Sequence, residues 1–294
     1  MTKELRGILF MCLAMLLFTG LDTAAKLVTR DLAPWVAVFF RYAVALLLGL
    51  AILLARKGIN GVTTRHPGLQ TIRGLLLMGS TICNFLAIQH LQLAQTAAIF
   101  FTIPLLVSAL SVPLLGEHVG WRRWLAVIVG FLGVLVIMRP GTTGFHWAMF
   151  YSLAAALQGA FYNIATRKVG GHDSAETSLF YVALVGGLAS IVPAGLDWTM
   201  PHGWQWLLLF SMGIFGTIGH FLLIEGHRLA PASRLAPFIY SQIIWMTLSG
   251  FFVFGDVPDR WTLAGAAIVV ASGLYLLQRE RIKGKTEAVA APSD

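Results

Sequence analysis

The chain has 294 residues, of which 57% are hydrophobic and only 12% carry a charge. A soluble domain of this size has about twice that charged share, so the composition excludes a water-soluble globular protein and predicts an integral membrane protein. The net charge of +8 does not indicate nucleic-acid binding, because the Lys and Arg residues form short clusters between apolar runs.

Ten apolar runs follow one another along the chain. A membrane-crossing helix needs about 20 such residues, and the runs lie near 7–27, 33–55, 71–90, 94–115, 121–138, 147–167, 176–196, 204–226, 232–254 and 261–278. They predict an all-α protein with ten transmembrane helices and no separate soluble domain. The polar segment 284–294 is predicted to be a disordered cytoplasmic tail.

Positive charge predicts the orientation of these helices, because short cytoplasmic segments carry an excess of Lys and Arg. Most of the 21 basic residues fall on one side when both termini are placed in the cytoplasm. The opposite segments hold only Arg30, Arg139 and Arg260. We therefore expect an N-in, C-in topology in a bacterial inner membrane.

The two halves of the chain resemble each other weakly. FLAIQHLQLA (85–94) can be laid over FLLIEGHRLA (221–230), and the Gly-Glu pair at 116–117 over the Gly-Asp pair at 255–256. This alignment places spans 1–5 (residues 1–141) over spans 6–10 (residues 142–283). Because five is odd, the second copy is inverted, and inverted repeats are typical of secondary transporters.

Three segments are similar to EamA-type members of the drug/metabolite transporter superfamily. They are IPLLVSALSVPLLGEHV (103–119), WRRWLAVIVGFLGVLVIMRPG (121–141) and PFIYSQIIWMTLSGFFVFGDVPDRWTLAGAAIVVASGLYLLQRE (237–280), in which Asp256 stands where the family usually has Glu. The resemblance covers nearly the whole chain. It implies two inverted five-helix halves around a central cavity, and alternating access without ATP.

The function expected from this resemblance is export of small metabolites, most of all aromatic or neutral amino acids. Uptake by the same fold is the alternative within transport. The alternative from another class is a membrane-embedded enzyme or lipid-handling protein, for which residues 225–228 form the only dense inner group. No cofactor or metal motif occurs, and the expected partners are a small-molecule substrate and the lipid bilayer, with the chain a monomer or a weak homodimer.

Charged residues within the spans are candidates for substrate binding, because charges at this depth are costly and usually face a cavity or a partner. Asp22 and Lys26 are four residues apart and share a helix face. They could engage the charged ends of a substrate or form an intrahelical ion pair, or the Lys26 side chain could extend to the outer interface. Arg41, followed by Tyr42, could bind a substrate carboxylate or act as a structural tie, for example to Asp22.

Polar and aromatic residues in the middle of spans form the second group of candidates. Amides can bridge helices as easily as they bind a ligand, whereas amides and rings facing an interior suit a zwitterion or a neutral solute. The candidates for substrate binding in this group are Asn84, Gln158, Tyr162, Asn163, Tyr240, Gln242 and Trp245.

Two further residues are candidates for proton coupling. His220 lies deep in span 8 after Gly213, Gly216 and Gly219, and a histidine there could exchange protons or stay neutral in a helix contact. Glu225, near the inner end of the same span, could carry protons or pair with Arg228. The glycines themselves predict a close helix-packing face.

Overall fold

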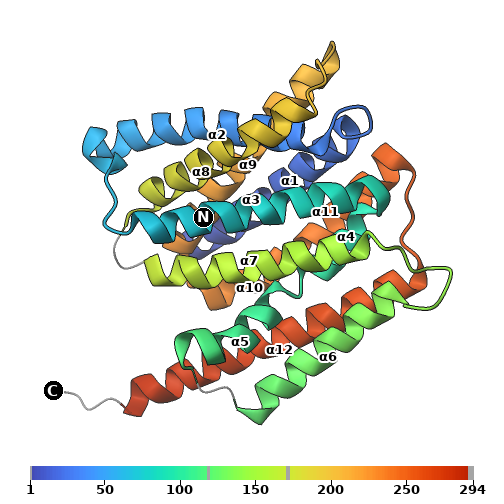
Figure 1. Cartoon of the computed structure of the whole chain (residues 1–294). Helices are drawn as coiled ribbons and strands as arrows, with labels where there is room; N and C mark the ends of the chain where they lie inside the picture. Colours follow the sequence, from blue (N-terminus) through green and yellow to red (C-terminus); the bar gives the residue numbers. More distant parts are fainter. Residues whose placement is uncertain (1, 118–119, 170–172, 291–294) are drawn as a thin grey trace.

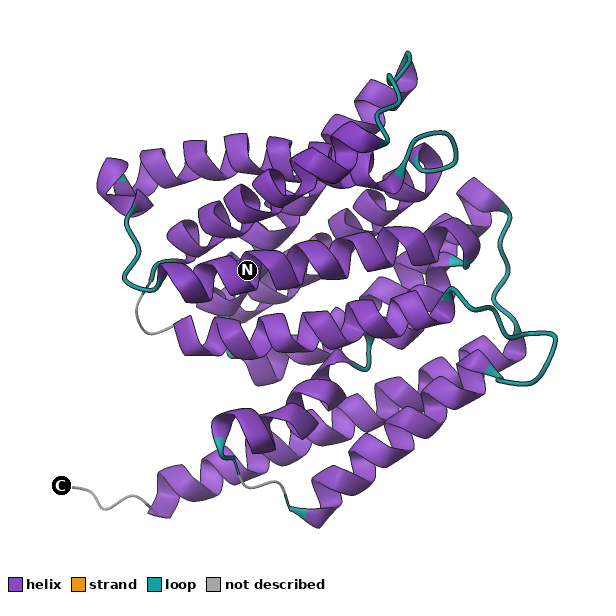
Figure 2. Cartoon of the chain, in the orientation of Figure 1, coloured by secondary structure: helices purple, strands orange, loops and turns teal. Residues whose placement is uncertain are grey.

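The computed structural model describes residues 2–117, 120–169 and 173–290, and within these ranges it contains helices and no strand. Short loops join most of the helices (Figure 2). The first half comprises α1 (Lys3–Val28), α2 (Pro34–Lys57), the 3-10 turn η1 (Ile59–Val62), α3 (Pro67–His90), α4 (Leu93–Phe100), α5 (Ile103–Leu115) and α6 (Trp121–Met138). The second comprises α7 (Met149–Val169), α8 (Ala175–Leu196), α9 (Trp204–Leu229), α10 (Ala232–Ile239), α11 (Ser241–Ser249), the π-helical turn η2 (Gly250–Phe254) and α12 (Arg260–Ala290).

Nine of the described segments have the length and hydropathy of a membrane-crossing helix. The tenth predicted span corresponds to α7, whose polar residues Gln158 and Asn163 lower its hydropathy. With 21 residues, α7 is about 31 Å long and still long enough to cross the hydrocarbon core. Since α7 packs against α3, α4 and α5, protein rather than lipid covers part of its surface. The predicted fold class, an all-α multi-pass membrane protein, is confirmed.

Two spans that the sequence predicts as continuous are interrupted near their middle. Span 4 is divided into α4 and α5 at residues 101–102, and span 9 into α10 and α11 at Tyr240. A proline lies close to each break, Pro104 in the first turn of α5 and Pro237 in the last turn of α10. Proline has no amide hydrogen for the helical ladder. The two breaks meet, because the rings of Phe101 and Tyr240 lie 4.9 Å apart.

Helix pairing is the same when the two halves are exchanged. Helix α1 packs along α9, and its counterpart α7 packs along α3; α1 also contacts the broken span α10/α11, as α7 contacts α4/α5. The remaining counterparts pair with each other, α2 with α8 at one edge and α6 with α12 at the opposite edge (Figure 1). This pattern is what a two-fold relation between the halves produces, and such a relation suits a transporter in which one half moves against the other.

Glycines let α9 approach α1 and α2 closely. A Cβ on Gly213 would lie 2.4 Å from the Cβ of Val44, and a Cβ on Gly219 would lie 2.8 Å from the ring of Phe18. Gly216 lies between them, with Leu21 at 3.0 Å from the same imagined position. The three glycines therefore form a packing face, as their spacing predicts.

The last helix extends further than the sequence predicts. Disorder is expected from residue 284, but α12 continues to Ala290. Lys, Glu and Ala, which make up much of this segment, have high helix propensity, so the helix can continue beyond the apolar span. Residues 291–294 lie outside the described residues.

Candidate functional site

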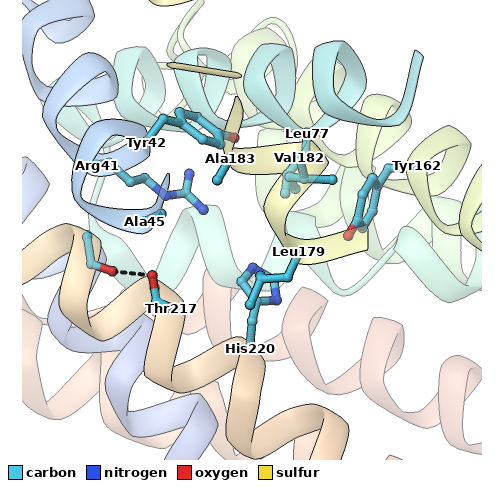
Figure 3. A pocket seen from close by; sticks show the side chains of 12 residues that line it. Arg41, Tyr42, Ala45, Leu77, Tyr162, Leu179, Val182, Ala183, Thr217 and His220 are labelled. Atoms are coloured by element: carbon cyan, nitrogen blue, oxygen red, sulfur yellow. Dashed lines mark hydrogen bonds between the residues drawn. The ribbon is translucent and has the colours of Figure 1, made fainter. Parts of the chain in front are cut away.

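A pocket lies between the two halves, near the middle of the bundle. Its cavity volume is about 40 Å³. The ligand pockets of proteins start at about 300 Å³, so this pocket has to widen before it can admit a small metabolite. Five helices supply the lining, which consists of Arg41, Tyr42 and Ala45 on α2, Leu77 on α3, Tyr162 on α7, Leu179, Val182 and Ala183 on α8, and Gly213, Gly216, Thr217 and His220 on α9 (Figure 3).

Arg41 is the charged group of this lining. Its guanidinium donates a hydrogen bond to Thr81 Oγ1 on α3 and lies 5.1 Å from the centre of the Tyr42 ring. The Tyr42 hydroxyl and Thr81 Oγ1 are 3.0 Å apart, so Thr81 orients both pocket residues. A guanidinium has five N–H donors, and within the described part of the chain no carboxylate lies within 4.0 Å of that of Arg41. In Figure 3 the guanidinium points into the space between the five helices.

Asp22 and Lys26, which the sequence places on one helix face, have separate partners. The Asp22 carboxylate is buried, with 8% of the residue exposed, and accepts a hydrogen bond of 2.9 Å from Asn84 Nδ2 on α3. Lys26 Nζ donates to the carbonyl oxygen of Leu91 at 2.8 Å and forms an ion pair of 3.1 Å with Asp256. Lys26 therefore ties α1 to the outer end of span 9, and no intrahelical ion pair with Asp22 forms.

His220 on α9 and Tyr162 on α7 both line the pocket. The imidazole of His220 packs edge-on against the ring of Phe18, with 4.9 Å between the centroids. Beneath Tyr162 lies Arg73, whose guanidinium carbon is 5.3 Å from the centre of the Tyr162 ring. Arg73 also donates to Thr166 Oγ1 at 3.0 Å, so a buried cation supports the tyrosine that lines the pocket.

Glu225 belongs to an ion-pair cluster at the cytoplasmic end and not to the pocket. Its Oε1 lies 3.0 Å from Arg56 Nη1 on α2 and 3.0 Å from Arg228 Nη1 on its own helix. Glu176 on α8 joins the same two arginines, at 3.3 Å from Arg56 and 3.6 Å from Arg228. This cluster links three helices about 20 Å below Arg41, judged by the 1.5 Å rise per residue along α2.

The amides of α7 lie outside the pocket lining. Gln158 Nε2 donates to the Ala154 carbonyl at 3.2 Å and contacts Cys83 Sγ at 3.3 Å. Its carboxamide fits against Gly79, where a Cβ would lie 1.9 Å from Gln158 Oε1. Asn163 is exposed and donates to the carbonyl of Gly159 on its own helix. Gln158 thus bridges α7 and α3, and the predicted substrate contact of both amides stays a prediction.

The candidates on span 9 also lie away from this pocket. The Tyr240 ring packs on Phe101 at the helix breaks, and its buried hydroxyl has no hydrogen-bond partner among the described residues. Trp245 lines a separate, mostly apolar groove along α1, α9 and α11. Gln242 is half-buried. Substrate contact at these three positions stays a prediction.

Two residues that support the pocket were not among the sequence candidates. Arg73 lies at the very start of the predicted span 71–90, where a basic residue is expected at the membrane surface, yet it is only 2% exposed. Pro67, a favourable residue for the first turn of a helix, begins α3 one turn before the expected span and brings Arg73 inside. Thr81 carries no signal in the sequence, because a threonine within a span often bonds only to its own helix.

Two related halves with a central pocket between them are the architecture of a membrane transporter. The chain belongs to the EamA-like transporter family, whose model matches residues 5–139 and again 146–278. The double match gives one copy of the family unit to each half.

Transporters with different named substrates are similar to this chain over nearly its full length. An S-adenosylmethionine uptake transporter of Rickettsia felis is 28% identical over 94% of both chains. A riboflavin transporter of Vibrio cholerae is 29% identical over 96% of both, and a pseudopaline exporter of Pseudomonas aeruginosa is 24% identical over 94% of this chain and 97% of its own. A solved crystal structure superposes with a TM-score of 0.66 at 21% identity, covering 94% of this chain and 98% of the other, which shows the shared fold.

Proposed function

We propose that this transporter carries a small metabolite with a carboxylate and a planar ring, the carboxylate bound by Arg41. The observation that carries the proposal is the position of Arg41, a charged group in an otherwise uncharged pocket lining. A half-buried guanidinium with no carboxylate in direct contact is costly. A cargo carboxylate would offset that cost through charge-assisted hydrogen bonds.

The rings around Arg41 support the second part of this proposal. Tyr42, Tyr162 and His220 line the same pocket as Leu77 and Val182. Aromatic and aliphatic walls with few polar groups favour an apolar or planar portion of a ligand. A molecule with an α-amino-acid group and a ring satisfies both features.

Two kinds of cargo meet this description. Aromatic amino acids, whose export is the expectation from the sequence, are the first. S-Adenosylmethionine is the second, because it combines an α-amino-acid group with an adenine ring and is named as the substrate of the Rickettsia relative. The relatives are named for uptake and for export, so uptake remains the alternative direction. All are named as transporters, which favours transport over the membrane-enzyme alternative.

The proposed mechanism is alternating access around this pocket. The outer ends are joined by Lys26 and Asp256, and the inner ends by the cluster of Arg56, Glu176, Glu225 and Arg228. The ion pairs of Lys26 and Arg56 join elements of opposite halves, so opening one side requires these pairs to separate. The predicted contacts at Gln158, Asn163 and Gln242 belong, in this proposal, to other stages of the cycle.

Counterflow in proteoliposomes tests the proposed function. Purified protein is loaded with unlabelled phenylalanine, tyrosine, leucine or S-adenosylmethionine, and entry of the same radiolabelled compound is measured without any ion gradient. We expect saturable exchange, and in Arg41→Gln an apparent affinity lower by about 10- to 100-fold, since hydrogen bonds to charged groups contribute about 1.5–3 kcal/mol.

The matched control is Arg122→Gln, which removes an exposed positive charge in the first turn of α6, outside the pocket lining and outside both groups of ion pairs. Its exchange should equal that of the unchanged protein. Absence of exchange with every compound of the panel, in protein that remains folded, would refute the proposed function. Equal affinities in Arg41→Gln and the unchanged protein would refute the role of Arg41.

A further inference from the structure

A buried carboxylate beside the pocket has no partner of opposite charge in direct contact. Asp22 accepts one hydrogen bond through Oδ1, from Asn84 Nδ2 at 2.9 Å. Within the described ranges no basic side chain lies within 4.0 Å of its carboxylate, and Oδ2 accepts no hydrogen bond. An ionised carboxylate in such surroundings is expensive, and a proton on the free oxygen removes that cost.

The charged and titratable groups around Asp22 leave Arg41 as its electrostatic partner. From α2, the Arg41 guanidinium interacts with the Asp22 carboxylate without contacting it. From α9, His220 packs on Phe18, one turn before Asp22 on α1. On its own helix, Lys26 is held by Asp256. Helix α11 presents the hydroxyl of Ser249, 2.6 Å from Thr23 Oγ1, and on α10 Arg234 pairs with Glu4 at the far end of α1.

We propose that Asp22 is the proton-binding group of this transporter and that its proton travels in the same direction as the cargo. This inference rests on the proposed function, because it requires the cargo carboxylate to occupy Arg41. The proton bonds to a carboxylate oxygen of Asp22 when it leaves water on one side, and returns to water on the other. No other bond forms or breaks.

Coupling follows from the single cation that both carboxylates share. In the empty pocket, the charge of Arg41 stabilises the ionised form of Asp22. A cargo carboxylate on Arg41 cancels that charge and adds a negative charge near Asp22, so the neutral acid becomes the favoured form. Binding of a proton and binding of cargo therefore strengthen each other, and the effect is reciprocal. Mutual strengthening favours joint transport over exchange of cargo for protons.

The two residues that the sequence nominates for proton coupling are placed less suitably. Glu225 is held between Arg56 and Arg228, each at 3.0 Å, so its carboxylate already has two cationic partners in direct contact, whereas that of Asp22 has none. His220 lines the pocket but is packed against an aromatic ring, and a positive charge on it would add to that of Arg41. Asp22 is the candidate whose charge opposes that of Arg41.

Accumulation driven by a pH gradient separates this inference from the proposed function. Proteoliposomes with an acidic exterior should accumulate external cargo by about tenfold per pH unit if a proton accompanies each molecule, since one pH unit corresponds to a tenfold equilibrium ratio. The isosteric variant Asp22→Asn should retain counterflow and lose this accumulation. The matched control Asp31→Asn, at the outer end of the same region and bonded to Gln205, should keep both.

Each outcome has one meaning. Failure of counterflow in the unchanged protein refutes the proposed function, whereas counterflow without gradient-driven accumulation refutes joint transport with a proton. Accumulation that persists in Asp22→Asn overturns the assignment to Asp22. If His220→Gln or Glu225→Gln then loses the accumulation, the proton site is the residue replaced in that variant.

Proton uptake on binding provides a second measurement that a purely structural role would not affect. Purified protein in weak buffer with a pH-sensitive dye should take up protons when phenylalanine or S-adenosylmethionine binds, up to one for each molecule bound. Asp22→Asn should bind without proton uptake. If Asp22→Asn does not fold, Asp22→Glu, which keeps a titratable carboxyl, should preserve the uptake. Absence of proton uptake in the unchanged protein with bound cargo contradicts the proposal.

Discussion

Two adjacent glycines of α8 provide a matched test of how the pocket residue Tyr42 is held. A Cβ added at Gly186 would lie 2.6 Å from Cδ1 and Cε1 of the Tyr42 ring, whereas a Cβ at Gly187 would lie 3.9 Å from the Tyr42 Cβ. Both positions are on one helix, and the substitution, to alanine, is the same. Only Gly186→Ala forces the tyrosine to move.

The size of the effect follows from these distances. Ordinary contacts of a Cβ lie at 3.4–4 Å, so Gly186→Ala requires a displacement of about 0.8–1.4 Å, obtained by subtracting the 2.6 Å contact. Overpacking of this kind costs about 1–3 kcal/mol. This displacement would also break the hydrogen bond between Tyr42 and Thr81, which is 3.0 Å long in the structure. Its loss would lower the free energy of unfolding by about a further 0.5–1.5 kcal/mol.

The assay combines thermal unfolding in detergent with counterflow. We expect Gly186→Ala to unfold at a lower temperature and to bind cargo more weakly, because Tyr42 lines the pocket. Gly187→Ala should match the unchanged protein in both. Equal stability and equal transport of the two variants would refute the reasoning that close packing of α8 on α2 positions Tyr42.

Two further predictions concern ionic contacts at the cytoplasmic side. Glu176→Gln removes a carboxylate that is 8% exposed and lies between two arginines, and it should lower the free energy of unfolding by about 1–3 kcal/mol. The control is Glu117→Gln, whose ion pair is exposed and which should change the free energy of unfolding by less than about 1 kcal/mol. Similar losses in unfolding experiments on the two variants would contradict the role of burial. Partial burial raises the pKa of Asp173, but hydrogen bonds from Thr64 and Gln70 outweigh it and hold the pKa below 3.8. The stabilisation from the Asp173 carboxylate is therefore fully present above pH 3.8 and is lost as the pH falls through the lower folded-state pKa. Unfolding free energies measured against pH should show this loss, and Asp173→Asn should abolish it. The same pH dependence in Asp173→Asn and in the unchanged protein would refute the contribution of Asp173.

The fold was predictable because membrane insertion imposes a strong rule on the sequence. Every backbone polar group within the hydrocarbon core needs an internal partner, so long apolar runs can only be helices. The two breaks were less visible, because Pro104 and Pro237 do not fall at equivalent positions of the repeat. The breaks themselves, at residues 101–102 and at Tyr240, meet only in the folded bundle.

The candidate site was predictable in kind and only partly in membership. Arg41, Tyr42, Tyr162 and His220 are candidates from the sequence and line one pocket. Depth in a span indicates that a polar side chain needs a partner, but not whether the partner is a ligand or another helix. Gln158 illustrates the difference, since its amide contacts its own helix and α3.

The sequence by itself determined that this chain crosses a membrane many times and consists of two related halves. These properties depend on local composition and period, which each segment carries alone. The tertiary structure decided which charges meet: Lys26 joins Asp256 instead of its neighbour Asp22, Glu225 joins Arg56, and Asp22 remains beside Arg41. Such pairings depend on the register between helices distant in the chain. That register is set by close contacts at glycines such as Gly186 and Gly213, so the pocket exists only when the whole bundle is assembled.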